Sequence, residues 1–280
     1  MRILVTGATG RVGSEIAQFI DRQANQVVLA MRTPESTGWD RTESVLFDFA
    51  QPSTYEPALN GVNSLFLMRP PAVKAVDRRL KQIVDVAIAL NIQQIVFLSV
   101  LGAEQNKLLP HRATEDYIKS TGIAYTFLRA SFFMQNLSSV HRREIEADSE
   151  IFVPAGQGKT SFVDARDIAA VAAAALTGSG HKCKAYSLTG REALNYYQVA
   201  EILSDVLARP IIYANPSVFQ FIARQLERKA PLDLTLVMSG IYTTAKLGMA
   251  GRIFDDVVDV LGRSPISFRT FAEDYRDCWL

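Results

Sequence analysis

The 280-residue sequence has few cysteines and histidines, no excess of charge of either sign and no long apolar run. Cys183 and Cys278 lie far apart and no Cys/His cluster occurs, so nothing favours a disulfide framework or a metal site. The net charge of +1 gives no electrostatic case for nucleic-acid binding, and the apolar stretch 168–176 is too short to span a membrane. Since no secretory signal is visible, we expect a cytoplasmic protein without metal, nucleic-acid or membrane partners.

The first half of the chain alternates strand-like and helix-like segments. Apolar runs predict strands at 2–7, 26–32, 44–49, 63–68, 93–100 and 124–131. Helical spacing of apolar residues predicts helices at 11–23, 72–91 and 110–122, the last opened by Pro110 and closed by Gly122. This order predicts an α/β fold, a Rossmann-type doubly wound parallel sheet that binds ligands beyond the carboxyl ends of its strands.

The pattern changes after about residue 135. Residues 151–156 and 185–190 resemble isolated short strands, and 164–176, 195–208 and 217–230 resemble helices. We therefore expect a nucleotide-binding domain at 1–135, joined by returning segments from 150–190. Most of 136–280 is expected to form a smaller, discontinuous cap domain that holds the substrate.

The stretch "VTGATGRVGSE" places three glycines between the first strand and the first helix. Gly7 would permit the tight turn, Gly10 would let a phosphate approach the backbone, and Gly13 would let helix and strand pack closely. The opening amides of the helix would face the pyrophosphate of a dinucleotide, with contacts from Thr9, Arg11 and Val12. The alternative is a glycine-rich turn that binds nothing.

The residues that end the next strands indicate which dinucleotide binds. Arg32 follows the second strand, near the position where NAD-binding proteins carry an acidic residue, and a guanidinium would pair with the 2′-phosphate of NADP(H). The alternative is a solvated loop arginine. Five further residues are expected along the adenine and ribose: Asp48, Phe49, Met68, Arg69 and Pro70. Asp48 could instead be a cap or turn residue, and Arg69 could be solvated.

Several segments resemble the short-chain dehydrogenases/reductases of atypical type, and within them the NmrA-like family. These segments are "TGATGRVG", "IVFLSVLGA", "HRATEDYIKSTGIAYTFLRASFFMQN", "SFVDARDIAAVAAAAL" and "LGRSPISFRTFAEDY". The resemblance runs nearly end to end. It implies an NADPH-dependent reductase of the kind that acts on quinones or triphenylmethane dyes, although the family also includes regulatory proteins.

The sequence departs from the wider superfamily at its catalytic pair, Tyr-x-x-x-Lys. His111 stands at the tyrosine position, Glu115 at the lysine position, and Ser99 matches the superfamily's serine. The first turn of a helix would lower the pKa of His111, which is the candidate catalytic residue. Its alternative is a structural role, and the alternative for Glu115 is a salt bridge to His111 or Lys119 at i,i+4 spacing.

The segment "SFFMQN" leaves the sixth strand where the nicotinamide is expected. Phe132 and Phe133 would wall a flat apolar pocket, unless they join the core, and Asn136 matches an asparagine of the family. Without the tyrosine acid, hydride transfer from NADPH to an electron-poor conjugated acceptor is favoured over ketone chemistry. Open alternatives are a redox sensor that binds NADP(H) without turnover and a biosynthetic imine or enone reductase. A monomer or a homodimer is expected.

Overall fold

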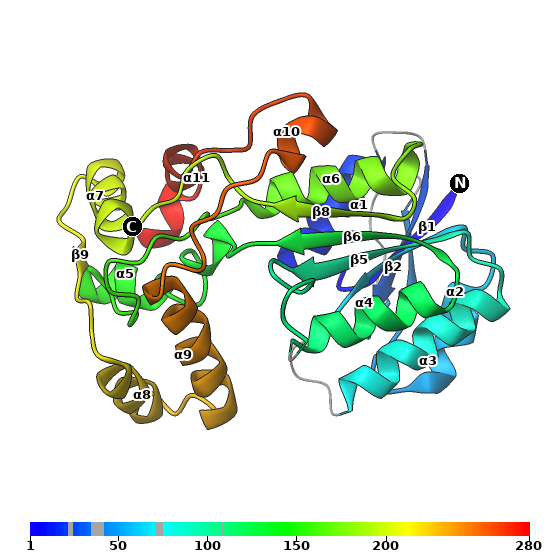
Figure 1. The fold of residues 1–280 in the computed structure, drawn as a ribbon, viewed down its shortest axis with the longest axis horizontal. Coiled ribbons are helices and arrows are strands. Elements are labelled where there is room, and N and C mark those ends of the chain that lie inside the picture. The colour runs from blue at the N-terminus through cyan, green and yellow to red at the C-terminus, as the bar shows by residue number, and fades with distance from the viewer. Residues whose placement is uncertain (22–24, 35–41, 71–74, 108) are drawn as a thin grey trace. The chain divides into compact units, whose positions relative to one another are not determined.

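A computed structural model describes residues 1–21, 25–34, 42–70, 75–107 and 109–280. The chain divides into two compact units (Figure 1). The first unit consists of Met1–Ala130, Ala165–Leu188 and Asp256–Arg263, and the second of Ser131–Asp164, Thr189–Asp255 and Ser264–Leu280.

The described residues of the first unit form a parallel sheet of seven strands in the order β3-β2-β1-β4-β5-β6-β8. The strands are β1 (Arg2–Val5), β2 (Gln26–Met31), β3 (Thr42–Leu46), β4 (Ser64–Met68), β5 (Gln94–Val100), β6 (Ala124–Ala130) and β8 (Lys184–Leu188). β1 pairs with both β2 and β4, so the strand order reverses there. The expected doubly wound sheet is confirmed, and its ligand crevice is predicted at this reversal point.

Helices flank this sheet on both faces (Figure 1). They are α1 (Arg11–Asp21), α2 (Tyr55–Leu59), α3 (Val76–Ala89), α4 (Pro110–Ser120), α6 (Ala165–Thr177) and α10 (Asp256–Leu261), with the 3₁₀ turn η1 (Pro52–Thr54). α1 packs against α6, while α3 packs against both α2 and α4. Ile3, Leu4 and Val5 are all fully buried, because helices cover both faces of the sheet.

Two strand expectations are wrong. The isolated strand expected at 151–156 is reduced to Glu150–Ile151, which pairs in parallel with Ile212–Tyr213. Residues 185–190 were expected to form an isolated strand, but β8 pairs with β6 in parallel register, Thr126 opposite Lys184. The second unit's first segment is inserted between these two strands in the sequence, so their adjacency is not local. α10 joins the same edge, where the Asp256 carboxylate accepts a hydrogen bond of 2.8 Å from the Ser187 amide.

The second unit is mainly helical. Its elements are η2 (Met134–Asn136), α5 (Arg142–Asp148), β7 (Glu150–Ile151), α7 (Tyr196–Leu207), β9 (Ile212–Tyr213), α8 (Val218–Glu227), α9 (Leu232–Lys246), α11 (Phe268–Asp274) and η3 (Arg276–Trp279). Asn195 and Ser217 begin α7 and α8 with reciprocal capping hydrogen bonds. Fully buried rings fill its core, among them Phe162, Phe221 and Trp279.

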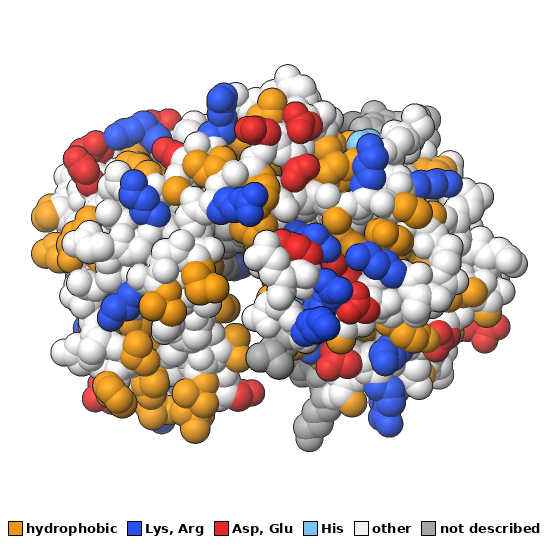
Figure 2. Space-filling model, viewed as in Figure 1, with side chains coloured by type: hydrophobic (Ala, Val, Ile, Leu, Met, Phe, Trp, Pro, Cys, Tyr) orange, Lys and Arg blue, Asp and Glu red, His pale blue; other side chains and the backbone are white. Residues whose placement is uncertain are grey.

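Apolar side chains remain exposed along α9: Leu232, Leu234, Leu236, Val237 and Ile241. Figure 2 shows such side chains gathered over α8 and α9. Exposed apolar faces of this kind are typical of surfaces that contact a ligand or another chain.

Candidate functional site

The turn between β1 and α1 requires its glycines for steric reasons. Gly7 has a φ of +65°, and a Cβ there would lie 2.1 Å from Sδ of Met68. A Cβ on Gly13 would lie 2.2 Å from the Gly7 carbonyl oxygen, so α1 and the turn approach too closely for any side chain. A Cβ on Gly10 would meet only that same oxygen, at 3.1 Å. The turn is therefore tight and carries no side chain at its glycines. The first amides of α1, which have no carbonyl partner within the helix, follow it directly, and this arrangement fits the pyrophosphate of a dinucleotide.

Hydrogen bonds fix this turn at the reversal point of the sheet. The Gly10 amide donates to the Gly7 carbonyl at 2.8 Å. The Thr6 hydroxyl donates to the Phe66 carbonyl at 2.9 Å and accepts from the Met68 amide at 3.1 Å, which ties β1 to the end of β4. Thr9, Gly10 and Arg11 are exposed, whereas Val12 is buried under the turn.

Arg32 is exposed directly after β2. That position is the one where a guanidinium would meet a phosphate on the adenosine ribose. Its proposed pairing with the 2′-phosphate stays a prediction.

At the end of β3, Asp48 is a turn residue. Its Oδ1 accepts from the Ala50 amide at 2.8 Å, and Oδ2 accepts from the Gln51 side chain at 3.3 Å. Phe49 is half-buried, and its ring lies edge-on to that of Phe47 with centroids 5.1 Å apart. Contacts of Asp48 and Phe49 with adenine stay predictions.

At the end of β4, Met68 lies beside the glycine turn and Arg69 is paired rather than solvated. The Arg69 guanidinium forms an ion pair with the Asp77 carboxylate on α3. Pro70 follows and is half-buried. Arg69 thus lies along the carboxyl edge with its guanidinium held in place.

A buried polar network joins α4, β5 and β6 at Ser99 and Glu115, the residues that the resemblance aligns with the superfamily's serine and lysine. The Ser99 hydroxyl on β5 donates to Glu115 Oε1 on α4 at 2.6 Å. Arg129 on β6 donates to the same carboxylate through Nε at 3.0 Å and Nη2 at 2.7 Å. Glu115 is fully buried.

The expected i,i+4 salt bridge of Glu115 is wrong, because the partner of the carboxylate is Arg129. The Lys119 ammonium instead lies 5.4 Å from the centre of the Phe127 ring. Arg129 is the site residue that the sequence analysis missed. No local spacing indicates it, since it contacts Glu115 only because β6 pairs with β5 and places Arg129 opposite Ser99.

His111 lies in the first turn of α4 and is half-buried. Burial, and next the Arg69 guanidinium, lower its pKa to about 4, against the opposing effects of Glu115 and Asp77. The direction agrees with the sequence-based expectation, although burial is the main cause. The imidazole is therefore neutral at pH 7, and a neutral ring offers one hydrogen-bond donor and one acceptor but no strong acid.

The profile of the NmrA-like family matches residues 1–246. The chain belongs to the NmrA-like family. The resemblance seen in the sequence is thus confirmed.

Two proteins and one solved structure illustrate what this NmrA-like chain is similar to. It is 30% identical to the NAD(P)H azoreductase of Xenophilus azovorans, with 97% of this chain and 96% of the relative covered. It is 29% identical to festuclavine synthase II of Penicillium roqueforti, with both chains covered in full. The crystal structure of Citrobacter sp. triphenylmethane reductase complexed with NADP(H) superimposes with a TM-score of 0.86 at 26% identity, covering 96% and 98% of the two chains.

The candidate substrate residues lie in the second unit. The Phe132 ring packs edge-on to Phe162, with centroids 5.7 Å apart, and tilted against Tyr242 at 5.8 Å. Phe132 therefore packs partly against the core, in agreement with the alternative interpretation that this ring joins the core rather than lining a pocket. Phe133 is half-buried, and its backbone forms a parallel bridge with Val163. The Asn136 carbonyl accepts from the His141 amide at 3.0 Å, so its backbone shapes the loop. Substrate roles for the three stay predictions.

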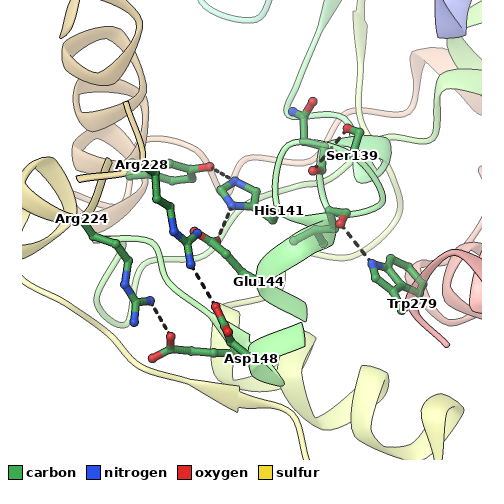
Figure 3. A network of polar contacts seen from close by, with 11 residues as sticks. Ser139, His141, Glu144, Asp148, Arg224, Arg228 and Trp279 are labelled. Carbon is green, nitrogen blue, oxygen red and sulfur yellow. Dashed lines mark hydrogen bonds and ion pairs between the residues drawn. The ribbon is translucent and has the colours of Figure 1, made fainter. Parts of the chain in front are cut away.

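A second buried network lies within the second unit (Figure 3). His141 Nδ1 lies 3.1 Å from Glu144 Oε2, and Nε2 lies 2.5 Å from the Tyr242 hydroxyl. Arg228, directly after α8, links Glu144, at 2.5 Å, to Asp148, at 2.9 Å. The sequence had shown no partners for His141. The network joins α5, α8 and α9, and it consists of side chains that satisfy one another.

The described residues bring together no group of three His, Cys, Asp or Glu side chains that would hold a metal ion. None of the helices in the described part of the chain has the length and apolar content needed to cross a lipid bilayer.

Proposed function

We propose that this NmrA-like protein passes a hydride from NADPH to a conjugated, electron-poor small molecule such as a quinone, an azo dye or a triphenylmethane dye. The chain is an NAD(P)H-dependent oxidoreductase, as its family, its glycine turn and relatives such as the azoreductase indicate. The class of acceptor is inferred from two side chains, Ser99 near the end of β5 and His111 in the first turn of α4.

The proposed nucleotide site lies along the carboxyl edge of the first unit. The pyrophosphate faces the glycine turn, and Arg32 pairs with the 2′-phosphate, which selects NADP(H). The remaining proposed contacts follow the chain: Gly7, Thr9, Gly10, Arg11, Val12, Gly13, Asp48, Phe49, Met68, Arg69, Pro70 and Ser99. When bound, NADPH supplies a hydride from its nicotinamide ring.

The proposed class of acceptor is supported by one observation: among the proposed site residues, neither Ser99 nor His111 can act as the acid that protonates an alkoxide. The only proton of the Ser99 hydroxyl is donated to Glu115, at 2.6 Å. His111, with a pKa of about 4, is neutral and serves as a hydrogen-bond partner for the acceptor. A simple ketone that accepts hydride needs a matched acid for its alkoxide, and neither side chain provides one.

Electron-poor conjugated acceptors avoid that requirement. A triphenylmethyl cation takes the hydride at its central carbon and becomes neutral without any proton. A quinone takes the hydride and one proton from water and becomes a hydroquinone. The chain then contributes orientation rather than acid catalysis. We assign Phe132, Phe133 and Asn136 to acceptor binding, with Phe133 favoured because Phe132 packs against other rings.

Steady-state oxidation of NADPH with a panel of acceptors tests the function. The panel holds a quinone, an azo dye, a triphenylmethane dye and, as a control, an unactivated ketone. We expect turnover with one or more of the conjugated acceptors and none with the ketone. Tight NADPH binding without turnover of any conjugated acceptor would contradict the proposal and favour a redox sensor. Rapid turnover of the ketone would contradict the assigned acceptor class.

A further inference from the structure

The carboxylate of Glu115 connects three elements of the first unit. It lies on α4, accepts one hydrogen bond from Ser99 on β5, and accepts two from Arg129 on β6. The two bonds from Arg129 are the bidentate arrangement that fixes both distance and orientation. α4 is therefore tied to the ends of two neighbouring strands at a single side chain.

A second tie holds the same helix one turn earlier. The Arg112 guanidinium donates through Nη1 to the Glu104 carbonyl oxygen at 2.8 Å. The Glu104 carboxylate in turn forms an ion pair of 3.2 Å with Arg129 Nη1. The contacts run from Glu115 to Arg129, then to Glu104, then to Arg112. The backbone of α4 between Arg112 and Glu115 closes the ring, which is called the circuit below.

His111 lies at the start of this circuit. It directly precedes Arg112, and Glu115 follows one helical turn later on the same face, at i,i+4 spacing. Glu115 and Arg69 also act on the imidazole electrostatically, in opposite directions. The position and surroundings of the ring therefore depend on where the circuit holds the first turn of α4.

The chemistry of the circuit is unusual for a purely structural contact. Well-packed apolar side chains of similar volume often stabilise a fold as well as a buried ion pair does, or better. Here the ion pair is fully shielded at Glu115, which lies on α4 and which the resemblance places at the superfamily's lysine position. The Glu115 carboxylate does not take over the lysine's function of binding ribose, because it is fully buried and its two oxygens accept hydrogen bonds from Ser99 and Arg129.

We propose that Glu115 and Arg129 are positioning residues of the reductase that hold His111 in place for hydride transfer. In the superfamily, the lysine lowers the pKa of the tyrosine that acts as the acid. In this chain, the circuit instead holds the neutral imidazole of His111 in position. The inference rests on the proposed function, because it assigns His111 a role in turnover. Neither Glu115 nor Arg129 needs to touch the acceptor.

A double-mutant cycle between Glu115→Gln and His111→Asn tests this role, with NADPH and a quinone, whose carbonyl oxygen can accept a hydrogen bond from the imidazole. We expect each single variant to lower kcat about 10- to 100-fold, the scale of a misplaced reacting group, with KM for NADPH changed less than about threefold. If Glu115 acts through His111, the double variant loses no more than the worse single variant, within about twofold. Losses that multiply would overturn the inference. The same holds if either single variant keeps wild-type kcat.

A readout without turnover separates this inference from the proposed function. The chain has three histidines, so the imidazole resonances of the resting protein can be assigned by single substitutions. Glu115→Gln is expected to shift the His111 resonances and leave those of His141 and His181 unchanged. Unshifted His111 resonances would overturn the inference. Shifted resonances in a protein that oxidises no NADPH would contradict the proposed function and leave the link from Glu115 to His111 intact.

The chain offers a matched control and a substitute variant. Glu146→Gln removes an exposed carboxylate of α5 that pairs with Arg142 at 3.3 Å and lies outside the circuit, and it is expected to change kcat less than about twofold. Arg129→Lys keeps the charge and loses the bidentate bond, so it should give a smaller loss of the same kind, and it replaces Glu115→Gln if that variant does not fold. Equal losses in Glu146→Gln and Glu115→Gln would overturn the inference.

Discussion

Arg32 is the residue on which the choice between NADP(H) and NAD(H) rests. It is exposed after β2, where a carboxylate would repel a 2′-phosphate and a guanidinium would pair with it. We expect Arg32→Asp to weaken NADPH binding about 100-fold or more, and NADH binding only about threefold or less. Calorimetric titration with both nucleotides measures the difference. Equal losses for the two nucleotides would remove the assignment to NADP(H).

His111 makes the stability of the fold depend on pH. Its pKa is about 4 in the folded chain, whereas an unfolded histidine titrates near its ordinary value of 6.5. Between these values the unfolded chain binds more protons, so the folded state loses stability as the pH falls from 6.5 to 4. The groups that act on the ring are Arg69, Glu115 and Asp77.

Urea unfolding between pH 4 and 7 tests this dependence by comparison with His111→Asn. Across the window, the wild type should lose about 2 to 3 kcal/mol more than the variant, since one pKa unit corresponds to about 1.4 kcal/mol. The carboxylates common to both proteins cancel in the difference. Parallel stability curves would mean that His111 titrates normally in the folded chain.

Single residues show how far sequence reasoning reaches at this site. The signals that identify a residue are sometimes local in the sequence. A strand, a turn and a helix start in succession indicated Gly7, Gly10 and Gly13, and a family motif at the start of a helix indicated His111. Arg129 could not be identified in this way, since its contact with Glu115 depends on the register of β5 and β6. Local spacing had instead paired Glu115 with His111 or Lys119, which lie one helical turn away on the same face.

At the scale of elements, β1, β2, β4, β5 and β6 could be predicted because parallel strands buried on both faces give continuous apolar runs. β3 is the exception: only one of its five residues is buried, and it spans Thr42–Leu46 where 44–49 was expected. The seventh strand, β8, has two exposed residues among its five, and the sequence between it and β6 belongs largely to the second unit. Its place in the sheet was therefore not predictable from local pattern. α9 was also missed, because apolar residues occur around most of its circumference and no single face stands out.

The network that joins α5, α8 and α9 should stabilise the second unit through the hydroxyl of Tyr242. Tyr242→Phe keeps the ring contacts and leaves the buried Nε2 of His141 without its partner at 2.5 Å. We expect a loss of about 1 to 3 kcal/mol in the free energy of unfolding, measured with denaturant. Tyr197→Phe, at an exposed ring on α7, is the control and should cost less than about 0.5 kcal/mol. Equal costs for the two variants would show that the His141 contact contributes nothing.

At the scale of the whole molecule, each unit has its own core, and the proposed nucleotide contacts all lie in the first unit. The chain belongs to the NmrA-like family, and relatives such as the NAD(P)H azoreductase and festuclavine synthase II support an NAD(P)H-dependent oxidoreductase. His111 and Glu115 stand where the superfamily has its tyrosine and lysine. Because the tyrosine acid is missing, we propose acceptors that take a hydride without an acid.

Transfer of deuterium tests this account most directly. The protein is incubated with a triphenylmethane dye and NADPH that carries deuterium at C4 of the nicotinamide, on the transferred face. The colourless product is then analysed by mass spectrometry. The account predicts one deuterium on the central carbon of the product, where it does not exchange with water, and a rate that does not require protonation of a side chain. A product without deuterium would contradict direct hydride transfer by this protein.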